Sequence, residues 1–383
     1  MKIIKIEPYI ICHQLDTPFH FSQWQYDTRK ICIVKITLED GTYGWGEGYG
    51  PANVVKAAIE FFAPFIMGRN ALENETIWQE MYLRSMDYAR SGTFTAGMSA
   101  IDVALWDLKG KILNQPVSVL LGGIKNPLIE PYATGLYFER VKNLEKKLVD
   151  EALFYKEQGF RSTKMKVGLG IEQDVQLVSA IRKAIGPDMG LMIDSNHAYS
   201  YKEALELCHQ LEPLDIGWFE EPVSPEDYKG YNQLRANTSI PIAGGECEYL
   251  KHGFKRLLEQ ECVDIVQPDI CAAGGLTEAK RIAVLAQAHH KDVVPHTWGT
   301  WIAISAAVHL VANLDKNPGR MYGSRPTMEL DRTENALRDE VTTHQIEIIE
   351  GQLFVPTKPG LGVEVCEEAL AKYMMEEPVA LQA

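Results

Sequence analysis

RSTKMKVG, residues 161–168, places two lysines one residue apart in a run that otherwise has the short apolar residues of a buried strand. Side chains at positions i and i+2 of a strand point to the same side, so we expect Lys164 and Lys166 to lie next to each other. Each ammonium group then raises the free-energy cost of charging its neighbour, which lowers the lysine pKa. The pattern predicts a lysine that gives up its proton readily, as a general base must.

Around this strand, from about Tyr132 onward, short apolar runs alternate with amphipathic helical segments. The ends of the candidate strands follow one another at intervals of 23 to 28 residues, at Lys166, Asp194, Glu220, Glu246, Asp269 and His296. One strand-plus-helix unit of an eightfold barrel takes about 30 residues, so the spacing favours a parallel (β/α) barrel. An open doubly wound sheet would alternate in the same way, but the chain contains neither GxGxxG nor GxxxxGK[ST].

The two ends of the chain have sequence patterns that differ from that of the barrel segment. The first third alternates like strands in IIKIEPYII, ICIVKITLEDG and YGWGEG, with a hairpin turn at Asp40-Gly41, and then continues as amphipathic helices. The last part, with HQIEIIEGQLFVPTKPGLGVEV, has the pattern of strands and turns. We therefore predict an α+β domain over residues 1–125, a barrel over 126–335, and a segment over 336–383 that returns to the first domain.

Composition and charge exclude several classes of protein. The 383 residues carry a net charge of −14 and no basic block, so we expect no nucleic-acid partner. The longest apolar run, 301–314, contains Ser305, His309 and Asn313 and is too short for a membrane span. The N-terminal sequence is too acidic for a secretion signal, and Pro8 interrupts it. The seven cysteines form no CxxC pair, which suits reduced thiols. We expect a soluble, cytoplasmic protein.

Three acids end neighbouring candidate strands: Asp194 in LMIDSN, Glu220 in IGWFEEP and Glu246 in PIAGGE. The carboxyl ends of the strands of a parallel barrel share one rim, where the active site lies, so these side chains should converge. Unpaired carboxylates repel one another in a dry pocket, and protonation or a hard cation relieves that repulsion. Oxygen ligands favour Mg²⁺ over Zn²⁺. A salt-bridged or solvated role is the alternative for any single acid, but three at regular spacing predict a metal site.

The next two strand ends carry an acid and a histidine, Asp269 in DIVQPDI and His296 in DVVPHTWGT. On neighbouring strands, the carboxylate can accept a hydrogen bond from one ring nitrogen and leave the other for proton transfer. Taken alone, a histidine beside Trp298 is more often structural, and the acid–base pair is the better interpretation only together with the other residues. Around the rim the order is then the lysine pair, the three acids and the Asp–His pair, so two bases would flank the metal from opposite sides. Such a site can move a proton on either face of a substrate.

These residues resemble the enolase superfamily and, within it, the mandelate racemase subgroup. The similarity extends over nearly the whole chain, through AIDVALWDLKGK, KMKVG, MIDSNHAY, WFEEPV, AGGE, VQPDICAAGG and VPHTWGT. The resemblance implies an α/β fold in which a modified (β/α)7β TIM-like barrel carries an α+β capping domain, built from the N-terminal third and the C-terminal tail.

The resemblance also implies roles for the residues at the strand ends. The three acids would bind Mg²⁺, with Glu221 left outside the ligand set. Lys166, supported by Lys164, would be one acid/base, and His296, with Asp269, would be the other.

Further residues would contact the substrate. Glu329 in PTMELDR matches a position that hydrogen-bonds the substrate carboxylate in this family, and Asn196 and Tyr49 are the other expected contacts. Specificity in the family lies in loops of the capping domain, which correspond here to residues 15–27 and 49–53.

Within the subgroup, LDTPF, YGPAN, YATG, GGECE and MELDRT are similar to galactarolactone cycloisomerases. This similarity implies removal of a proton α to a carboxylate, followed by β-elimination that opens the ring of an aldaric acid lactone. The alternatives are an acid-sugar dehydratase and a racemase or epimerase of an α-hydroxy acid. A Schiff-base aldolase needs no metal, and a barrel that only binds a sugar acid needs no bases, so both fit the residues less well. We expect a small carboxylate substrate and a homo-oligomer.

Overall fold

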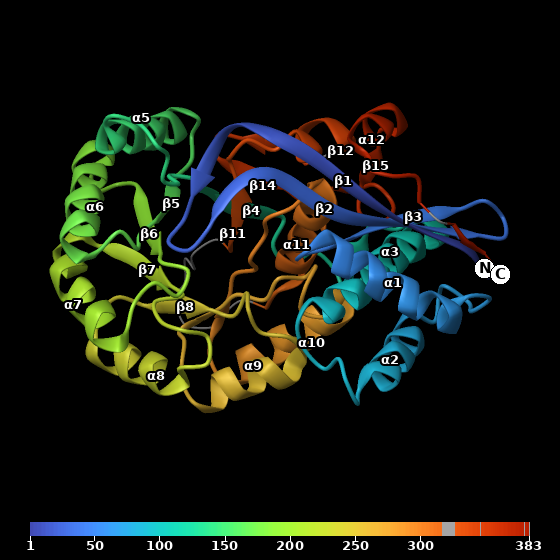
Figure 1. The fold of residues 1–383 in the computed structure, drawn as a ribbon. Coiled ribbons are helices and arrows are strands. Elements are labelled where there is room, and N and C mark those ends of the chain that lie inside the picture. The colour runs from blue at the N-terminus through green and yellow to red at the C-terminus, as the bar shows by residue number, and fades with distance from the viewer. Residues whose placement is uncertain (316–325, 345, 379, 383) are drawn as a thin grey trace.

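The structure is a computed structural model that describes residues 1–315, 326–344, 346–378 and 380–382. Figure 1 shows a ring of helices around short strands on its left-hand side, and an α+β domain on its right-hand side, where both chain termini lie. Two long strands of that domain, β1 (Ile3–His20) and β2 (Gln25–Leu38), extend across the ring. This is the architecture of a capping domain on a barrel that the sequence predicts.

The capping domain is an antiparallel sheet covered by helices. The sheet has the order β16 (Leu381–Gln382), β1, β2 and β3 (Tyr43–Gly48), and the predicted turn at Asp40-Gly41 joins β2 to β3. Glycines alternate in β3, and a Cβ at Gly46 would lie 1.9 Å from the backbone oxygen of Ala100, so α3 (Thr93–Leu113) packs directly against the strand. The helices of this part are α1 (Ala52–Ile66), α2 (Asn74–Ser85), α3 (Thr93–Leu113) and α4 (Val117–Leu120).

In the part of the chain that the structure describes, the barrel has eight strands and seven intervening helices, and every strand pair within it is parallel. Strands β4 to β10 are neighbours in chain order, and β11 pairs with β4. The strands are β4 (Leu128–Thr134), β5 (Ser162–Lys166), β6 (Gly190–Asp194), β7 (Ile216–Glu220), β8 (Ile242–Gly244), β9 (Ile265–Val266), β10 (Asp292–Val293) and β11 (Thr327–Asp331). The helices are α5 (Leu144–Glu157), α6 (Ile171–Ile185), α7 (Tyr201–Leu211), α8 (Tyr228–Asn237), α9 (Leu250–Glu259), α10 (Gly275–Ala288) and α11 (Trp301–Asn313), and η1 (Glu212–Leu214) follows α7.

Alternation along the strands separates the core from the site. In β5, Met165 packs into the main hydrophobic core outside the sheet, whereas both lysines point into the barrel, as the sequence predicts. In β7, Phe219 belongs to the same outer core, while Trp218 and Glu220 lie inside. Below the strand ends, the interior of the barrel is filled by an apolar layer of Tyr132, Met192, Trp218, Ala243 and Val294.

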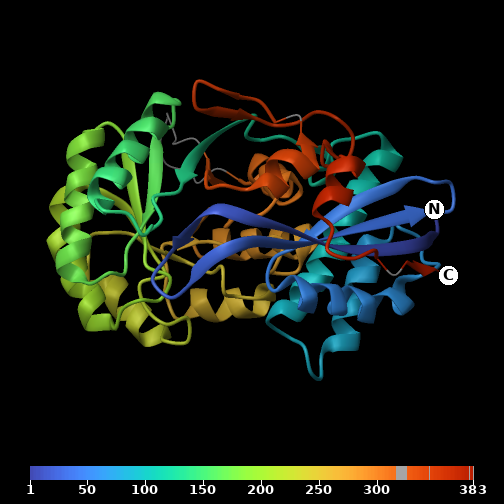
Figure 2. The ribbon, with the colours of Figure 1, turned by 45° about the horizontal axis from the view of Figure 1, so that its top comes forward.

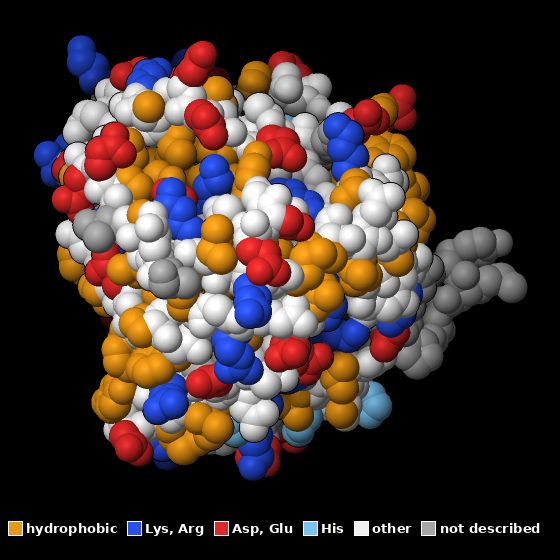
Figure 3. Space-filling view, turned by 90° about the vertical axis from the view of Figure 1, so that its right-hand side faces the viewer, with side chains coloured by type: hydrophobic (Ala, Val, Ile, Leu, Met, Phe, Trp, Pro, Cys, Tyr) orange, Lys and Arg blue, Asp and Glu red, His pale blue; other side chains and the backbone are white. Residues whose placement is uncertain are grey.

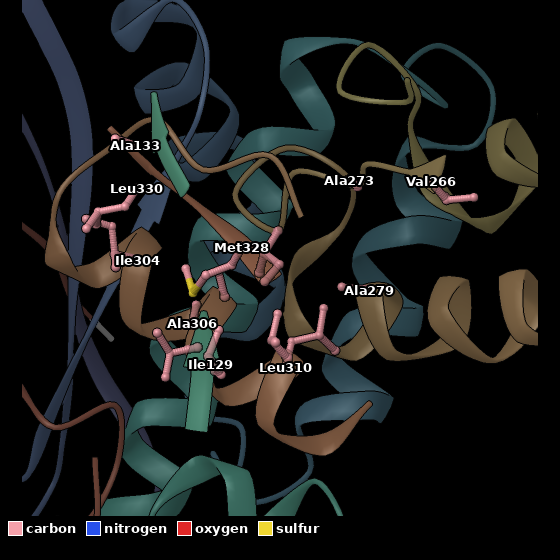
Figure 4. Packing of buried hydrophobic residues seen from close by; sticks show 14 of the residues in the cluster. Ile129, Ala133, Val266, Ala273, Ala279, Ile304, Ala306, Leu310, Met328 and Leu330 are labelled. Carbon is pink, nitrogen blue, oxygen red and sulfur yellow. The ribbon is translucent and has the colours of Figure 1, made fainter. Parts of the chain in front are cut away.

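Helix α11 is buried along its whole length, which explains its apolar sequence. Figure 4 shows how side chains of β4 and β11 pack against it, with Met328 and Ile129 next to Ala306 and Leu310. The apolar run that is too short for a membrane span is therefore a core helix. No helix in the described part of the chain is both long and apolar enough to cross a bilayer.

The C-terminal segment has contacts with both parts of the molecule. Strand β16 (Leu381–Gln382) pairs with β1 of the capping sheet, but β14 (Gln352–Phe354) pairs antiparallel with β4 and so extends the barrel sheet, a contact that the sequence does not predict. The other elements are η2 (Leu337–Val341), β12 (Thr342–His344), β13 (Ile348–Ile349), β15 (Val363–Val365) and α12 (Glu367–Tyr373).

Buried carboxylates hold the capping domain on the barrel. Glu47 of β3 accepts hydrogen bonds from the backbone nitrogen and hydroxyl of Thr300, and Asp102 of α3 accepts from Thr277. Figure 2 shows the β1–β2 hairpin lying across the barrel. On the side seen in Figure 3, basic, acidic and hydrophobic side chains are interspersed among the described residues.

Candidate active site

A cavity of about 190 Å³ lies at the carboxyl ends of the barrel strands, beneath the β1–β2 hairpin. Its lining includes both expected acid/base residues together with residues of the capping domain. The barrel contributes Tyr137, Lys166, Asn196, His197, Glu246, His296, Trp298 and Glu329, and the capping domain contributes Phe21, Gln23, Trp24, Tyr26 and Tyr49. This volume is below the roughly 300–1,000 Å³ of common ligand sites, so the cavity suits a small substrate.

Both lysines are engaged by carboxylates. Lys166 Nζ lies 2.5 Å from Asp194 Oδ2 and 2.8 Å from Asn196 Oδ1. Lys164 Nζ contacts the Glu220 carboxylate and lies 2.9 Å from Glu329 Oε1. The carboxylate partners come from the strands β6, β7 and β11, and each lysine neutralises an acid that the sequence assigns to the metal.

These ion pairs overturn the predicted fall in the lysine pKa. Burial and the Lys164 ammonium both lower the pKa of Lys166, as expected, but the Asp194 carboxylate raises it further and leaves it above its ordinary value. For Lys164, burial is likewise outweighed by Glu220 and Glu329. The sequence-based argument counted the neighbouring lysine and omitted these carboxylates, which hold both lysines as ammonium ions in this arrangement. A neutral Lys166 stays a prediction for a site in which another cation balances Asp194 and Glu220.

The three predicted metal ligands lie at consecutive strand ends. Asp194 and Glu220 are register partners on β6 and β7, and Glu246 follows β8. Burial raises the pKa of Glu220 to about 7, with help from Asp194 and against the pull of Lys164. The other oxygen of Glu220 accepts hydrogen bonds from Trp218 Nε1 at 3.1 Å and Gln267 Nε2 at 2.7 Å.

The donor set of these acids fits a hard cation, because it consists of oxygen atoms only. Carboxylates also outnumber the cationic side chains Lys164, Lys166 and His296 around the cavity. The carboxylates are Asp194, Glu220, Glu246, Asp269 and Glu329, whereas burial holds the pKa of Glu221 well above its ordinary value. A divalent cation would compensate the excess negative charge. The three predicted ligands are nevertheless spread apart: in the described residues, the compact group with ligand atoms within 4.8 Å of one another is His197, Glu221 and Cys247.

The hydrogen bond expected between Asp269 and His296 is present, with His296 Nδ1 2.7 Å from Asp269 Oδ2. Asp269 is itself held by the backbone nitrogen of Cys271, 2.7 Å from its other oxygen. His296 Nε2 is directed toward Glu246 at 3.5 Å. Burial lowers the pKa of His296, but Glu246, Glu329 and Asp269 together raise it to about 10. The protonated ring is thus stabilised on one wall of the cavity.

Glu329 is buried at the end of β11 with both oxygens occupied. One oxygen lies 2.6 Å from Thr134 Oγ1 and 2.9 Å from Lys164, and the other accepts from the backbone nitrogen of Thr297 at 2.8 Å. Burial raises its pKa, but Lys164 and His296 lower it to about 2. A hydrogen bond to a substrate carboxylate needs a proton on one of the two groups, so the substrate contact expected for Glu329 stays a prediction.

The other two expected substrate contacts also lie at the cavity. Asn196 accepts from Lys166, and its backbone nitrogen donates to Asp194 Oδ1 at 2.9 Å. The ring of Tyr49 lies with its centroid 5.1 Å from that of His296, and its backbone nitrogen donates to the oxygen of Cys271. The capping domain and the barrel therefore meet at this histidine.

Apart from Tyr49, the sequence did not identify the individual aromatic residues that cover the cavity. Tyr26 packs against Trp298 with ring centroids 4.8 Å apart, and Phe19 packs against Tyr137 at 4.7 Å. The signal for them is the run PFHFSQWQY, residues 18–26, which is more aromatic than an exposed hairpin tip requires. The loop 15–27, which we expect to determine substrate specificity, includes this run. The contacts of the individual aromatic residues depend on how the capping domain docks on the barrel.

The tip of the β1–β2 hairpin, residues 19–26, is hydrogen-bonded to backbone oxygen atoms of the barrel. Ser22 Oγ donates to the oxygen of Ser195 at 2.7 Å, and Gln23 Nε2 donates to the oxygen of Asn196 at 2.8 Å. Both acceptors follow Asp194 directly in the chain. The cover of the cavity and the first predicted metal ligand are therefore connected through one short loop.

Comparison with known proteins identifies the family. Residues 5–122 match the mandelate racemase / muconate lactonizing enzyme N-terminal domain, and residues 147–369 match the enolase C-terminal domain-like family. The D-galactarolactone cycloisomerase of Agrobacterium fabrum is 38% identical over 382 residues, which covers 99% of this chain and 100% of the relative.

Solved structures agree with this assignment. The 3,6-anhydro-D-galactonate cycloisomerase from Zobellia galactanivorans is 68% identical, with a TM-score of 0.91 and coverage of 98% of this chain and 100% of that one. A racemase from Streptomyces coelicolor A3(2) with bound magnesium is 28% identical, with a TM-score of 0.86 over 97% of this chain and 100% of that one. The chain belongs to the mandelate racemase subgroup of the enolase superfamily and is an enzyme of that superfamily.

Proposed function

We propose that this enzyme is a Mg²⁺-dependent cycloisomerase that opens the ring of a 3,6-anhydro sugar acid by β-elimination. The observation that carries the proposal is the presence in one small cavity of two proton-transfer groups, Lys166 and the Asp269–His296 pair, beside a surplus of carboxylates. The 68% identical cycloisomerase, which matches over nearly the whole chain, supports this substrate class. An aldaric lactone, the substrate expected from the sequence, is the second candidate and is favoured by the 38% identical relative.

The chemistry of such a substrate makes specific demands on the site. In a 3,6-anhydro acid the ring oxygen is bonded to C3, which is β to the carboxylate. Removal of the proton from C2 and cleavage of the C3–O bond open the ring and leave an oxygen anion on C6, which takes up a proton. The enol between C2 and C3 then tautomerises to a 2-keto-3-deoxy acid. No atoms are lost, so the reaction is an isomerisation.

The leaving group separates the two candidate substrates. A lactone expels a carboxylate, which leaves without much acid assistance, whereas an anhydro ring expels an alkoxide, which needs a general acid. His296 is suited to this task because Asp269 accepts from Nδ1 and stabilises the protonated ring. We assign proton removal to Lys166 and protonation of the leaving oxygen to His296.

Asp194, Glu220 and Glu246 would hold the Mg²⁺ ion. When bound, the ion would supply Lewis-acid stabilisation of the negative charge that develops at the substrate carboxylate. The oxygen-only donor set, the excess of carboxylates and the magnesium bound in the racemase support this assignment. Lys166 can act as a base only as the neutral amine, so the charge of Asp194 must be balanced by a group other than Lys166.

The test is to incubate the Mg²⁺-loaded enzyme separately with 3,6-anhydro-D-galactonate, galactarolactone and open-chain galactonate, and to follow the products by NMR. We expect fastest turnover of the anhydro acid, to a 2-keto-3-deoxy acid of the same composition. A preference for the open-chain acid with loss of water would make the enzyme a dehydratase, and a preference for the lactone would restore the first expectation. Homo-oligomerisation stays a prediction, which light scattering on the same preparation tests.

A further inference from the structure

A second group of potential metal ligands lies beside the acids discussed above. His197, Glu221 and Cys247 follow the consecutive strands β6, β7 and β8, and one ligand atom from each lies within 4.8 Å of the others. His197 Nε2 lies 3.0 Å from Glu221 Oε2 and 3.5 Å from Cys247 Sγ. This group offers a nitrogen, an oxygen and a sulfur, so its chemistry differs from that of the oxygen-only site.

The hydrogen bonds of His197 orient it as a ligand. Its Nδ1 lies 3.2 Å from the backbone oxygen of Val223, which can only accept, so Nδ1 carries a proton. Nε2 is the nitrogen that faces Glu221 and Cys247. Metal-binding histidines commonly donate their other nitrogen to a backbone carbonyl in this way, which fixes the tautomer and the direction of the ring.

The separations suit a single borderline-soft cation. With zinc bonds of roughly 2.0–2.1 Å to nitrogen, 2.0–2.2 Å to oxygen and 2.3 Å to sulfur, two ligands at a tetrahedral angle lie about 3.3–3.6 Å apart. The observed distances of 3.5 Å between nitrogen and sulfur and 3.0 Å between nitrogen and oxygen are close to these values. Mg²⁺ strongly prefers oxygen ligands, so it would not compete well for this group.

We propose that His197, Glu221 and Cys247 form a second metal site, selective for Zn²⁺ and chemically similar cations. It lies between two cavities, because His197 lines the active-site cavity and Cys247 lines a separate cavity of about 770 Å³ next to α8 and α9. A cation can therefore reach the thiol from outside the active site. Glu221 and Cys247 directly follow Glu220 and Glu246, so an ion bound here is coupled to both proposed Mg²⁺ ligands through the backbone.

The test uses the full-length enzyme saturated with Mg²⁺ and titrated with Co²⁺, which takes zinc sites and reports its ligands by absorption. The expected result is a sulfur-to-cobalt charge-transfer band that is absent from the Cys247→Ser variant. Zn²⁺ added afterwards should abolish the band. In calorimetry, the Zn²⁺ affinity should fall by at least about tenfold in Cys247→Ser and His197→Gln, since even outer partners of a metal ligand are worth 10–100-fold.

The control is Cys366→Ser, which removes another partly exposed thiol that is far from Cys247 in the sequence. This variant should keep the charge-transfer band. Zinc that merely replaces magnesium at Asp194, Glu220 and Glu246 would have oxygen ligands and give no thiolate band. Absence of the band in the wild type, or a band that persists in Cys247→Ser, would overturn the proposal. Since the readout is absorption, the result does not depend on which sugar acid the enzyme converts.

Discussion

Lys166 Nζ lies 2.5 Å from Asp194 Oδ2, and the two residues are register partners on the adjacent parallel strands β5 and β6. A proposed base and a proposed metal ligand are thus each other's counter-ion. The ammonium form is stabilised as long as Asp194 has no other cation to balance its charge. Metal binding and the freeing of the base should therefore be linked.

Metal removal tests this link. Treatment with EDTA should abolish turnover of the preferred sugar acid, and Mg²⁺ should restore it, because the acids at β6, β7 and β8 would then regain their cation. Asp194→Asn should weaken Mg²⁺ binding measured by calorimetry, whereas Glu172→Gln, at an exposed acid of α6, should not. Full activity in metal-free protein would contradict the metal site.

Substitution of the two proton-transfer groups tests their division of labour. Lys166→Met and His296→Asn should each lower kcat by roughly 10²–10⁴-fold, the usual contribution of general acid–base catalysis. In D₂O, His296→Asn should still exchange the C2 hydrogen of a substrate that eliminates slowly, while Lys166→Met should not. Lys183→Met, at an exposed lysine of α6, is the matched control. If both Lys166→Met and His296→Asn kept a kcat near that of the wild type, a mechanism with two opposed acid/base residues would be excluded.

The fastening of the hairpin tip can be tested with Ser22→Ala. This change removes the hydroxyl that lies 2.7 Å from the backbone oxygen of Ser195 and 3.3 Å from that of Asn196, and such a hydrogen bond is worth about 0.5–1.5 kcal/mol. We expect kcat/KM to fall by up to about tenfold, because closure of the cavity over the substrate becomes less favourable. Ser224→Ala, which removes an exposed hydroxyl that contacts Glu226 and not the hairpin, should leave kcat/KM unchanged. A kcat/KM of Ser22→Ala equal to that of the wild type would show that other contacts hold the hairpin tip on the barrel.

His309, in the buried helix α11, predicts a pH dependence of stability. Its Nδ1 accepts from the backbone nitrogen of Ser118, its Nε2 donates to the oxygen of Leu361, and burial lowers its pKa to about 4. The unfolded chain takes up this proton near pH 6.5, whereas the folded chain does not until about pH 4. The free energy of unfolding should therefore fall as the pH falls through this window, by about 2 kcal/mol between pH 7 and pH 5 from this group alone.

Urea unfolding of the wild type and of His309→Gln at both pH values measures this contribution. The variant cannot take up the proton, so its loss of stability between the two pH values should be smaller by about that amount. His209→Gln, at an exposed histidine near the end of α7, should lose as much as the wild type. Equal losses in the wild type and His309→Gln would refute the prediction.

The sequence predicts those parts of the structure that depend on local periodicity. Alternation in β5 places both lysines inside the barrel, and the regular spacing of the strands places Asp194 and Glu220 side by side. Prediction from the sequence fails where segments that are far apart in the chain come into contact. The direction of the lysine pKa shifts depends on carboxylates 28 and 56 residues away, which no local pattern weighs against burial.

Two other features lie beyond such patterns for the same reason. The pairing of β14 with β4 joins segments more than 200 residues apart and involves only two residue pairs. The group of His197, Glu221 and Cys247 is formed by single residues of three loops, without a spacing typical of zinc sites. Both depend on how the loops are placed once the barrel has closed.

The hairpin tip contacts the barrel through the carbonyl oxygens of Ser195 and Asn196, which every amino acid at those positions would provide. Between Phe19 and Tyr26, which pack on Tyr137 and Trp298 of the barrel, the tip can thus vary without a matching change in the barrel, and the barrel can keep its acids and bases. New substrate preferences could therefore evolve, or be engineered, by exchange of this short segment alone. In the proposed reaction, the leaving oxygen would still meet the same proposed proton donor, His296.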